Sequence, residues 1–148
     1  MTQRQETAPQ EPVGGRVGLR AIDVDVHHQI TDWRALAPFT PAGLRHRFLR
    51  PGGPPLARHG FRPVGVRFGE APVPAGDGKL AHPAGDPQWV KEQYLERWGV
   101  DRAILTGSLL SLGVQPNADM AAAIARAVND WTLATWVRPF ACFKGSIL

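Results

Sequence analysis

The stretch Ile22-Asp-Val-Asp-Val-His-His28 decides the interpretation of this chain, because an apolar strand here ends in polar side chains. Asp25 and His27 are spaced i, i+2, and in a regular strand that spacing places two side chains on the same face. Carboxylate oxygen and neutral imidazole nitrogen are ligand types that suit Zn²⁺, Mn²⁺ or Fe²⁺. Asp25 and His27 are therefore candidate metal ligands.

Two ligands do not complete a metal site. Zinc usually takes three protein ligands in a catalytic site and four in a structural one, so a partner must come from elsewhere. The alternative is that Asp25 and His27 only lead the strand into a loop, and their spacing alone does not exclude it. The same alternation places Asp23 on the Asp25 face, where it could orient a ligand or pair with Arg20, and places His28 on the opposite face as a loop or packing histidine.

Length and composition indicate one domain. The chain has 148 residues, 43% of them hydrophobic, which is enough for a core.

Residues 1–18 are polar, lack the apolar run of a signal peptide and are expected to form a disordered leader. No stretch approaches the roughly 18 apolar residues of a membrane span. Cys142 is the only cysteine, so no intrachain disulfide can form, and a cytoplasmic location is expected.

The segment 51–87 is unusual in composition, because many of the chain's 16 glycines and 14 prolines fall within it. Such a segment excludes regular helix and central strand, and its length suggests a functional loop or an inserted excursion. Much of the formal charge of +4 comes from arginines between Arg45 and Arg67. These arginines form either a solvated face, a site for acidic groups, or, less favoured, a surface for nucleic-acid phosphates.

The remaining pattern alternates strands and helices. We predict strands at 19–26, 102–106 and from 144 to 148, short helices at 32–39 and 42–49 ended by Pro38 and Pro51, and two main helices. The first main helix is capped by Asp86, starts at Pro87 and ends at Gly99, with Val90, Tyr94, Leu95 and Trp98 as its apolar stripe. The second follows a cap at Asn117 or Asp119, with a stripe of Met120, Ile124, Ala127, Val128, Trp131 and Thr135. This order predicts an α/β fold with a parallel sheet, and three strands with two main helices would leave apolar surface open.

The stretch 22–28 resembles the first-strand metal motif of the amidohydrolase superfamily, in the branch that includes aminocarboxymuconate-semialdehyde decarboxylase, where Asp-x-His often stands for His-x-His. Residues 94–105 are similar to that family's first helix and second strand. Residues 127–131 and 143–148 resemble its second helix and third strand, so the likeness covers about residues 19–148.

The resemblance implies the N-terminal part of a (β/α)₈ TIM barrel, which typically needs about 250 residues. It implies that Asp25 and His27 bind a divalent metal, Zn²⁺ first and Mn²⁺ or Fe²⁺ as alternatives. The implied activity is hydrolysis or decarboxylation of a small organic substrate, with further ligands and the general base on later strands. We therefore expect the 148-residue chain alone to be inactive. Trp33 and Ser108 are candidate pocket residues, because both follow strand ends.

Two further functions stay open. A non-catalytic half-barrel would use its exposed sheet edge to associate with another chain, which leaves homo-oligomerisation open. A basic binding module would use the arginines between residues 45 and 67 on a nucleic acid. The metal enzyme is the favoured hypothesis, and no membrane partner is expected.

Overall fold

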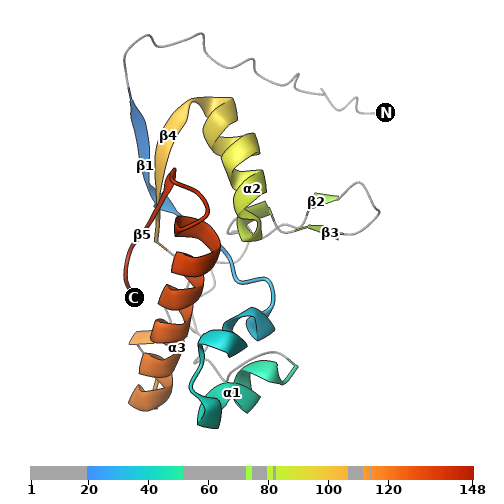
Figure 1. Ribbon diagram of the computed structural model, residues 1–148, viewed down its shortest axis with the longest axis vertical. Coiled ribbons are helices and arrows are strands. Elements are labelled where there is room, and N and C mark those ends of the chain that lie inside the picture. The colour runs from blue at the N-terminus through green and yellow to red at the C-terminus, as the bar shows by residue number, and fades with distance from the viewer. Residues whose placement is uncertain (1–19, 52–72, 75–79, 82, 107–111, 114) are drawn as a thin grey trace, which may run out of the picture.

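The computed structural model describes residues 20–51, 73–74, 80–81, 83–106, 112–113 and 115–148, and the structural statements below concern these residues. They form a mixed α/β fold (Figure 1). The predicted leader 1–18 and most of the segment 51–87 lie outside the described residues. None of the described helices is both long enough and apolar enough to cross a membrane.

Three strands form the main sheet, β1 (Ala21–Val26), β4 (Val100–Leu105) and β5 (Phe143–Gly145). Their spatial order is β1-β4-β5 and both pairs are parallel, which confirms the predicted α/β class and parallel sheet. The predicted bounds of the third strand, 144–148, are wrong. The strand starts at Phe143 and stops at Gly145, because the chain then turns toward a helix and the Leu148 N–H donates to Asn129 Oδ1 at 3.1 Å.

The first main helix has the predicted ends. It consists of α2 (Pro87–Val90) continued by the π-helical segment η3 (Lys91–Glu96). The Asp86 carboxylate accepts hydrogen bonds from Gln88 N at 2.9 Å and Trp89 N at 3.2 Å, so it is the N-cap. After the helix, Gly99 adopts a φ of 68°, a left-handed conformation that glycine allows without steric cost.

The second main helix is α3 (Ala118–Thr132), continued by the π-helical segment η5 (Leu133–Val137). Of the two predicted caps, Asn117 is the one used, because its Oδ1 accepts from Met120 N at 2.9 Å. The predicted stripe is buried as far as Trp131, but Thr135 is only half-buried and Trp136 is fully buried instead. A π turn carries i→i+5 bonds, which moves the next inward position from the fourth to the fifth residue after Trp131.

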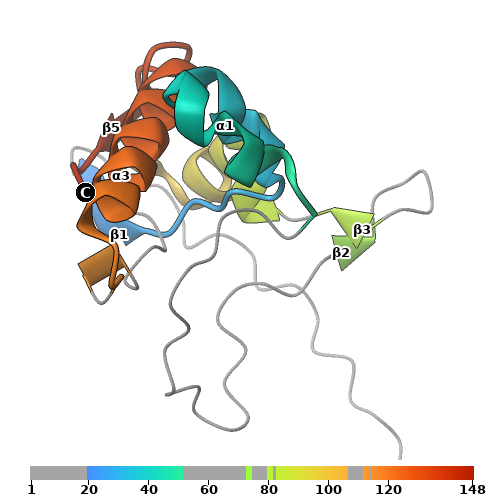
Figure 2. The same ribbon diagram turned by 90° about the horizontal axis from the view of Figure 1, so that it is seen from below.

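Two short helical segments follow β1. The 3₁₀ segment η1 (Trp33–Phe39) begins at Asp32, whose Oδ1 accepts from Arg34 N at 2.9 Å. It ends at Phe39, as the predicted bounds have it, and Pro38 lies inside it, because the last bond is donated by Thr40 N to Ala37 O and needs no donor from the proline. The helix α1 (Ala42–Leu49) matches its predicted bounds. α1 and α3 lie side by side in both views (Figure 1 and Figure 2).

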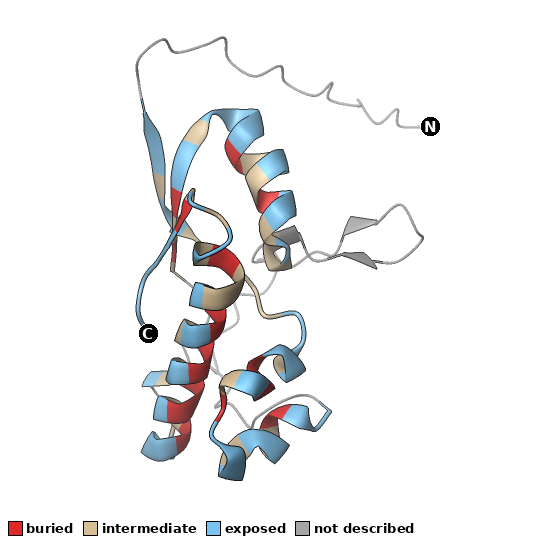
Figure 3. Cartoon of the chain, in the orientation of Figure 1, coloured by how far each residue is buried: buried red, intermediate tan, exposed pale blue. Residues whose placement is uncertain are grey.

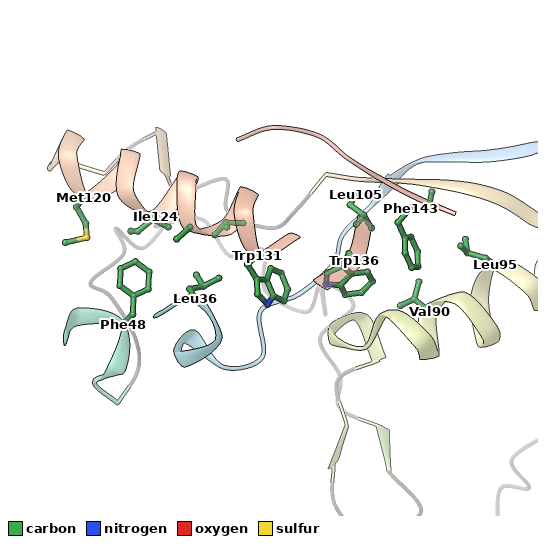
Figure 4. Packing of buried hydrophobic residues seen from close by; sticks show 13 residues of the cluster. Leu36, Phe48, Val90, Leu95, Leu105, Met120, Ile124, Trp131, Trp136 and Phe143 are labelled. Atoms are coloured by element: carbon green, nitrogen blue, oxygen red, sulfur yellow. The ribbon is translucent and has the colours of Figure 1, made fainter. Parts of the chain in front are cut away.

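The core lies on one face of the sheet (Figure 3). In one half, Met120 and Ile124 of α3 face Leu36 and Phe48 of η1 and α1 (Figure 4). In the other half, the core residues come from the sheet, α2, η3 and η5, namely Leu105, Phe143, Trp136, Val90 and Leu95. All the main helices therefore cover the same side of the strands. On the opposite side Ile22 is 57% and Val24 67% exposed, which confirms the expected open apolar surface.

The Pro/Gly-rich segment is described only in part. Its described residues include a two-stranded antiparallel hairpin, β2 (Val73–Pro74) and β3 (Leu80–Ala81), which lies apart from the main sheet, and a short 3₁₀ turn, η2 (Pro83–Gly85). The segment returns beside the end of β1, where Gln29 N donates to Ala84 O at 2.8 Å. An added Cβ at Gly85 would lie 2.4 Å from Thr31 Cγ2, so a larger residue there would require the exposed Thr31 side chain to shift.

Candidate metal centre

The candidate site is built from the carboxyl ends of neighbouring parallel strands. Asp25 and His27 lie at the end of β1, Thr106 directly follows β4 and Ser146 directly follows β5. Parallel strands bring these ends to one edge of the sheet, so side chains far apart in sequence become neighbours. Ser146 is held there by its Oγ, which donates to Leu105 O at 2.9 Å.

The β1 strand contains an irregularity that sets which way its polar side chains face. Asp23 pairs with Ala103 of β4, and Val26 pairs with Leu105. One residue thus lies between the partners on β4 while two lie between them on β1, so β1 holds one extra residue, as in a β-bulge. Asp23 and Val26 both share the helix-covered face with the buried Ala103 and Leu105. The prediction that Asp23 lies on the Asp25 face is therefore wrong.

Beyond the bulge the structure brings Asp25 and His27 together. His27 Nε2 lies 3.2 Å from Asp25 Oδ1, and the side chains are 48% and 68% exposed respectively. Thr106 Oγ1 donates to the same carboxylate oxygen at 2.8 Å. Two ligands held about 2.0–2.1 Å from a tetrahedral zinc ion lie roughly 3.3 Å apart. The Asp25–His27 separation is that of a direct imidazole–carboxylate contact, and it is also compatible with two atoms on one ion.

The order of these contacts constrains the chemistry of the site. In a nucleophilic triad the imidazole stands between the hydroxyl and the carboxylate, so that it can take the hydroxyl proton. Here the carboxylate stands in the middle, and both Thr106 and His27 contact Asp25 Oδ1. The arrangement does not activate Thr106 as a nucleophile. It instead orients a carboxylate beside an imidazole at a solvent-exposed edge, which is a chemically suitable donor set for a divalent metal.

Asp23 is held by a tyrosine on the helix layer rather than by Arg20. Tyr94 Oη of η3 donates to Asp23 Oδ2, and Asp23 Oδ1 accepts the Asp25 backbone N–H at 3.0 Å. The tyrosine hydrogen bond is the main cause that lowers the pKa of Asp23, with the Asp25 N–H adding to it. The same bond, together with partial burial, raises the pKa of Tyr94 to about 12.

His28 is a packing residue, as predicted. Its side chain is buried, its ring stacks on Trp131 with centroids 5.6 Å apart, and it meets Trp136 edge-on at 5.2 Å. His28 Nε2 lies 2.8 Å from Thr132 Oγ1. Burial, and secondarily the charge of His27, lowers the pKa of His28 to about 4. The buried ring therefore stays neutral at neutral pH.

The other predicted site residues are not brought to this edge by any described contact. Trp33 is half-buried and packs against the core. Ser108 lies outside the described residues, as do the arginines at 58, 62 and 67. Arg45 is partly committed to structure, because its Nε donates to Ala37 O at 3.0 Å. Cys142 is half-buried and packs against the core.

Sequence reasoning missed Thr106 and Tyr94 as parts of this network. Thr106 was available as the last polar residue of the next predicted strand, a position that parallel pairing brings beside the end of β1. Tyr94 was assigned to the apolar stripe of its helix, and nothing in that stripe indicates that its hydroxyl reaches a strand 71 residues away.

Asp25 and His27 are two candidate ligands, fewer than the three or four protein ligands of a zinc site. Among the residues that the structure describes, no three His, Cys, Asp or Glu side chains lie together as a metal-binding group. The donor types and their separation nevertheless fit two positions on one ion. No protein-family model and no curated protein sequence matches the chain.

Proposed function

We propose that this chain forms the N-terminal strands of a (β/α)₈ barrel of the amidohydrolase type, a metal-dependent hydrolase or decarboxylase of small organic substrates, and that Asp25 and His27 bind its divalent metal. The observation that carries the proposal is the 3.2 Å approach of Asp25 Oδ1 and His27 Nε2 at the carboxyl edge of a parallel sheet. Barrel enzymes place their active sites at that edge. The resemblance of residues 22–28 to the superfamily's first-strand motif supports the same assignment.

The sheet topology supports a barrel rather than a doubly wound fold. Strands β1, β4 and β5 are neighbours in the order in which they occur along the chain, and the intervening helices pack on one face. In a doubly wound sheet the strand order reverses, which places helices on both faces. A barrel instead keeps its helices outside and encloses the other face, here the face of Ile22 and Val24.

The residues present have distinct roles in this proposal. A bound divalent ion supplies Lewis-acid polarisation of a substrate oxygen and a bound water of lowered pKa. Asp25 and His27 would hold the ion, and Thr106 keeps the Asp25 carboxylate turned to the site through its 2.8 Å hydrogen bond. Zn²⁺ is the first candidate, with Mn²⁺ and Fe²⁺ as alternatives, since all three accept mixed oxygen and nitrogen ligands.

Paramagnetic broadening of NMR signals by Mn²⁺ tests the metal assignment, because it detects even the weak binding expected of two ligands. We expect selective broadening at residues 25, 27 and 106, lost in Asp25→Asn and in His27→Asn. His46→Asn is the matched control, because His46 is an exposed histidine on α1. Uniform broadening, or broadening that survives both ligand substitutions, would refute the metal site.

A half-barrel that associates through its open surface is the second candidate. The exposure of Ile22 and Val24 favours it, because contiguous exposed apolar residues often mark an interaction surface. Sedimentation of the metal-free chain distinguishes the two functions. Concentration-dependent dimerisation that Val24→Lys abolishes, without selective Mn²⁺ broadening, would favour the association module.

A further inference from the structure

We propose that Tyr94 and Asp23 are positioning residues that hold the β1 bulge and thereby present Asp25 to the metal site. The functional meaning of this inference rests on the proposed metal site, but the structural link can be tested without metal. Both residues act through the backbone of Asp25.

The link runs from the helix layer to the site in two hydrogen bonds. Tyr94 lies in η3, on the helix-covered side of the sheet, and its hydroxyl donates to Asp23 Oδ2. The other oxygen of the same carboxylate, Asp23 Oδ1, accepts the Asp25 N–H at 3.0 Å. Asp23 therefore uses both oxygens and joins a side chain of the helix to the backbone amide of the candidate ligand.

The bulge explains why Asp25 needs this support. Between the pairs Asp23–Ala103 and Val26–Leu105 the ladder of β1 and β4 is interrupted, and backbone groups at a bulge lack regular ladder partners. At this interruption the Asp23 carboxylate accepts the Asp25 N–H. Removing this bond leaves the extra residue of β1 without its local constraint.

The bulge also decides the face on which Asp25 lies. Without the extra residue, strand alternation would place Asp25 on the helix-covered face together with Asp23. With it, Asp25 reaches Thr106 Oγ1 at 2.8 Å and His27 Nε2 at 3.2 Å. The hydrogen bond from Tyr94 holds Asp23, which comes just before this change of face. Tyr94 therefore positions the candidate ligand Asp25 from the opposite side of the sheet.

Tyr94→Phe is the sharpest substitution, because it removes only the hydroxyl and keeps the ring. The matched control is Thr40→Val, which deletes another hydroxyl with a structural hydrogen bond, that of Thr40 Oγ1 to Leu36 O at 2.8 Å, away from the site. Tyr94 is also the only tyrosine of the chain, so its ring carbon bonded to the hydroxyl gives one NMR signal that reports the bond to Asp23 directly.

Hydrogen exchange of the Asp25 amide in the metal-free chain is the first measurement. We expect Tyr94→Phe to accelerate this exchange about tenfold relative to the exchange of core amides, and Thr40→Val to leave that ratio unchanged. An unchanged ratio in Tyr94→Phe would overturn the positioning role. This outcome does not depend on whether the chain binds metal.

Mn²⁺ affinity is the second measurement. Partners that orient metal ligands typically contribute about 10–100-fold to affinity, and we expect a loss near tenfold in Tyr94→Phe with none in Thr40→Val. If the unaltered chain shows no Mn²⁺ binding at Asp25 and His27, the proposed function fails, while the exchange result still decides the role of Tyr94. Binding by the unaltered chain with equal affinity in Tyr94→Phe would overturn the inference alone.

Discussion

The two faces of the β1-β4-β5 sheet differ in how far their apolar side chains are buried. On the face covered by helices, Ala103 and Phe143 are 0% exposed and Leu105 is 1% exposed. On the other face, Ile22 and Val24 are 57% and 67% exposed. Among the described residues, the same three strands thus carry one buried core face and one face on which Ile22 and Val24 are exposed.

The difference shows which face of the sheet the β-α-β crossovers can cover with helices. Each β-α-β crossover brings a helix onto the sheet with the same hand, so consecutive connections cover one face from within the chain. When strand order follows chain order, these crossover helices do not cover the opposite face. We infer that the covered face supplies most of the stability, whereas the open face and its carboxyl edge carry the proposed barrel interior and metal site.

Phe143→Ala should have the largest effect, because it opens the centre of the covered face. Phe143 is fully buried and meets Trp136 edge-on with centroids 5.3 Å apart. Truncation of a buried phenylalanine typically costs about 3–5 kcal/mol, and chemical denaturation monitored by tryptophan fluorescence will measure the loss. Lys144→Ala, at the next residue of β5 and exposed, should change the free energy of unfolding by less than about 0.5 kcal/mol. Equal effects of the two substitutions would contradict the contrast between the faces.

Acid should destabilise the covered face through protonation of His28. The pKa of His28 is lowered from 6.5 to about 4, mainly by burial, so below pH 6.5 the unfolded chain binds a proton that the folded chain does not. The contribution of this residue is therefore constant above about pH 6.5, is lost as the pH falls, and levels off below about pH 4. At about 1.4 kcal/mol per pH unit the loss approaches about 3 kcal/mol.

Measurements of unfolding free energy from pH 7 to pH 4 in the presence of a chelator isolate this effect. His28→Phe should flatten the profile relative to the unaltered chain, because the stacked position keeps an aromatic ring that cannot be charged. His46→Asn, at an exposed histidine, should leave the profile as it was. A profile that is equally steep with and without His28 would show that the buried imidazole does not control acid stability.

The covered face could largely be predicted from the sequence, because its signals are local. The Asp86 cap, Pro87 at the first helical position and Gly99 at the end fixed a helix whose bounds the structure confirms. The apolar stripe of α3 was predicted correctly until its π turn. There the π turn moves the inward position from Thr135 to Trp136. The prediction failed because the apolar periodicity of the sequence does not show where a helix changes from four-residue to five-residue spacing.

The candidate site was predictable only in part, for a physical reason. Asp25 and His27 were singled out by their types and spacing, and the structure places them 3.2 Å apart. The assignment of Asp23 to the same face failed because the extra residue of β1 is defined by pairing with β4, and strand register is not a local property. Thr106 and Tyr94 reach the network by contacts between distant segments, which residue patterns do not encode.

Gly99 forms the turn after the first main helix. Substitution there should lower the free energy of unfolding more than the exposure of the residue suggests. Gly99 has a φ of 68°, and a side chain in this left-handed conformation costs roughly 1–2 kcal/mol, although nothing lies within 4 Å of the added Cβ. Gly99→Ala should therefore lower the free energy of unfolding by about that amount. Gly99→Asn should lose less, since asparagine tolerates this conformation. Equal stability of the alanine variant and the unaltered chain would show that the turn is not constrained in solution.

A matched pair of isoleucines includes the smallest expected effect, at Ile22, and gives the most direct test of the comparison. Ile124 of α3 is 0% exposed and Ile22 of β1 is 57% exposed, so the same change to alanine probes the two environments. Ile124→Ala should cost about 2–5 kcal/mol and Ile22→Ala less than about 0.5 kcal/mol in dilute solution. A comparable loss at Ile22 would mean that the open face is already covered in solution. If that loss grows with protein concentration, the cover is a second copy of the chain, because only an association linked to folding makes stability depend on concentration.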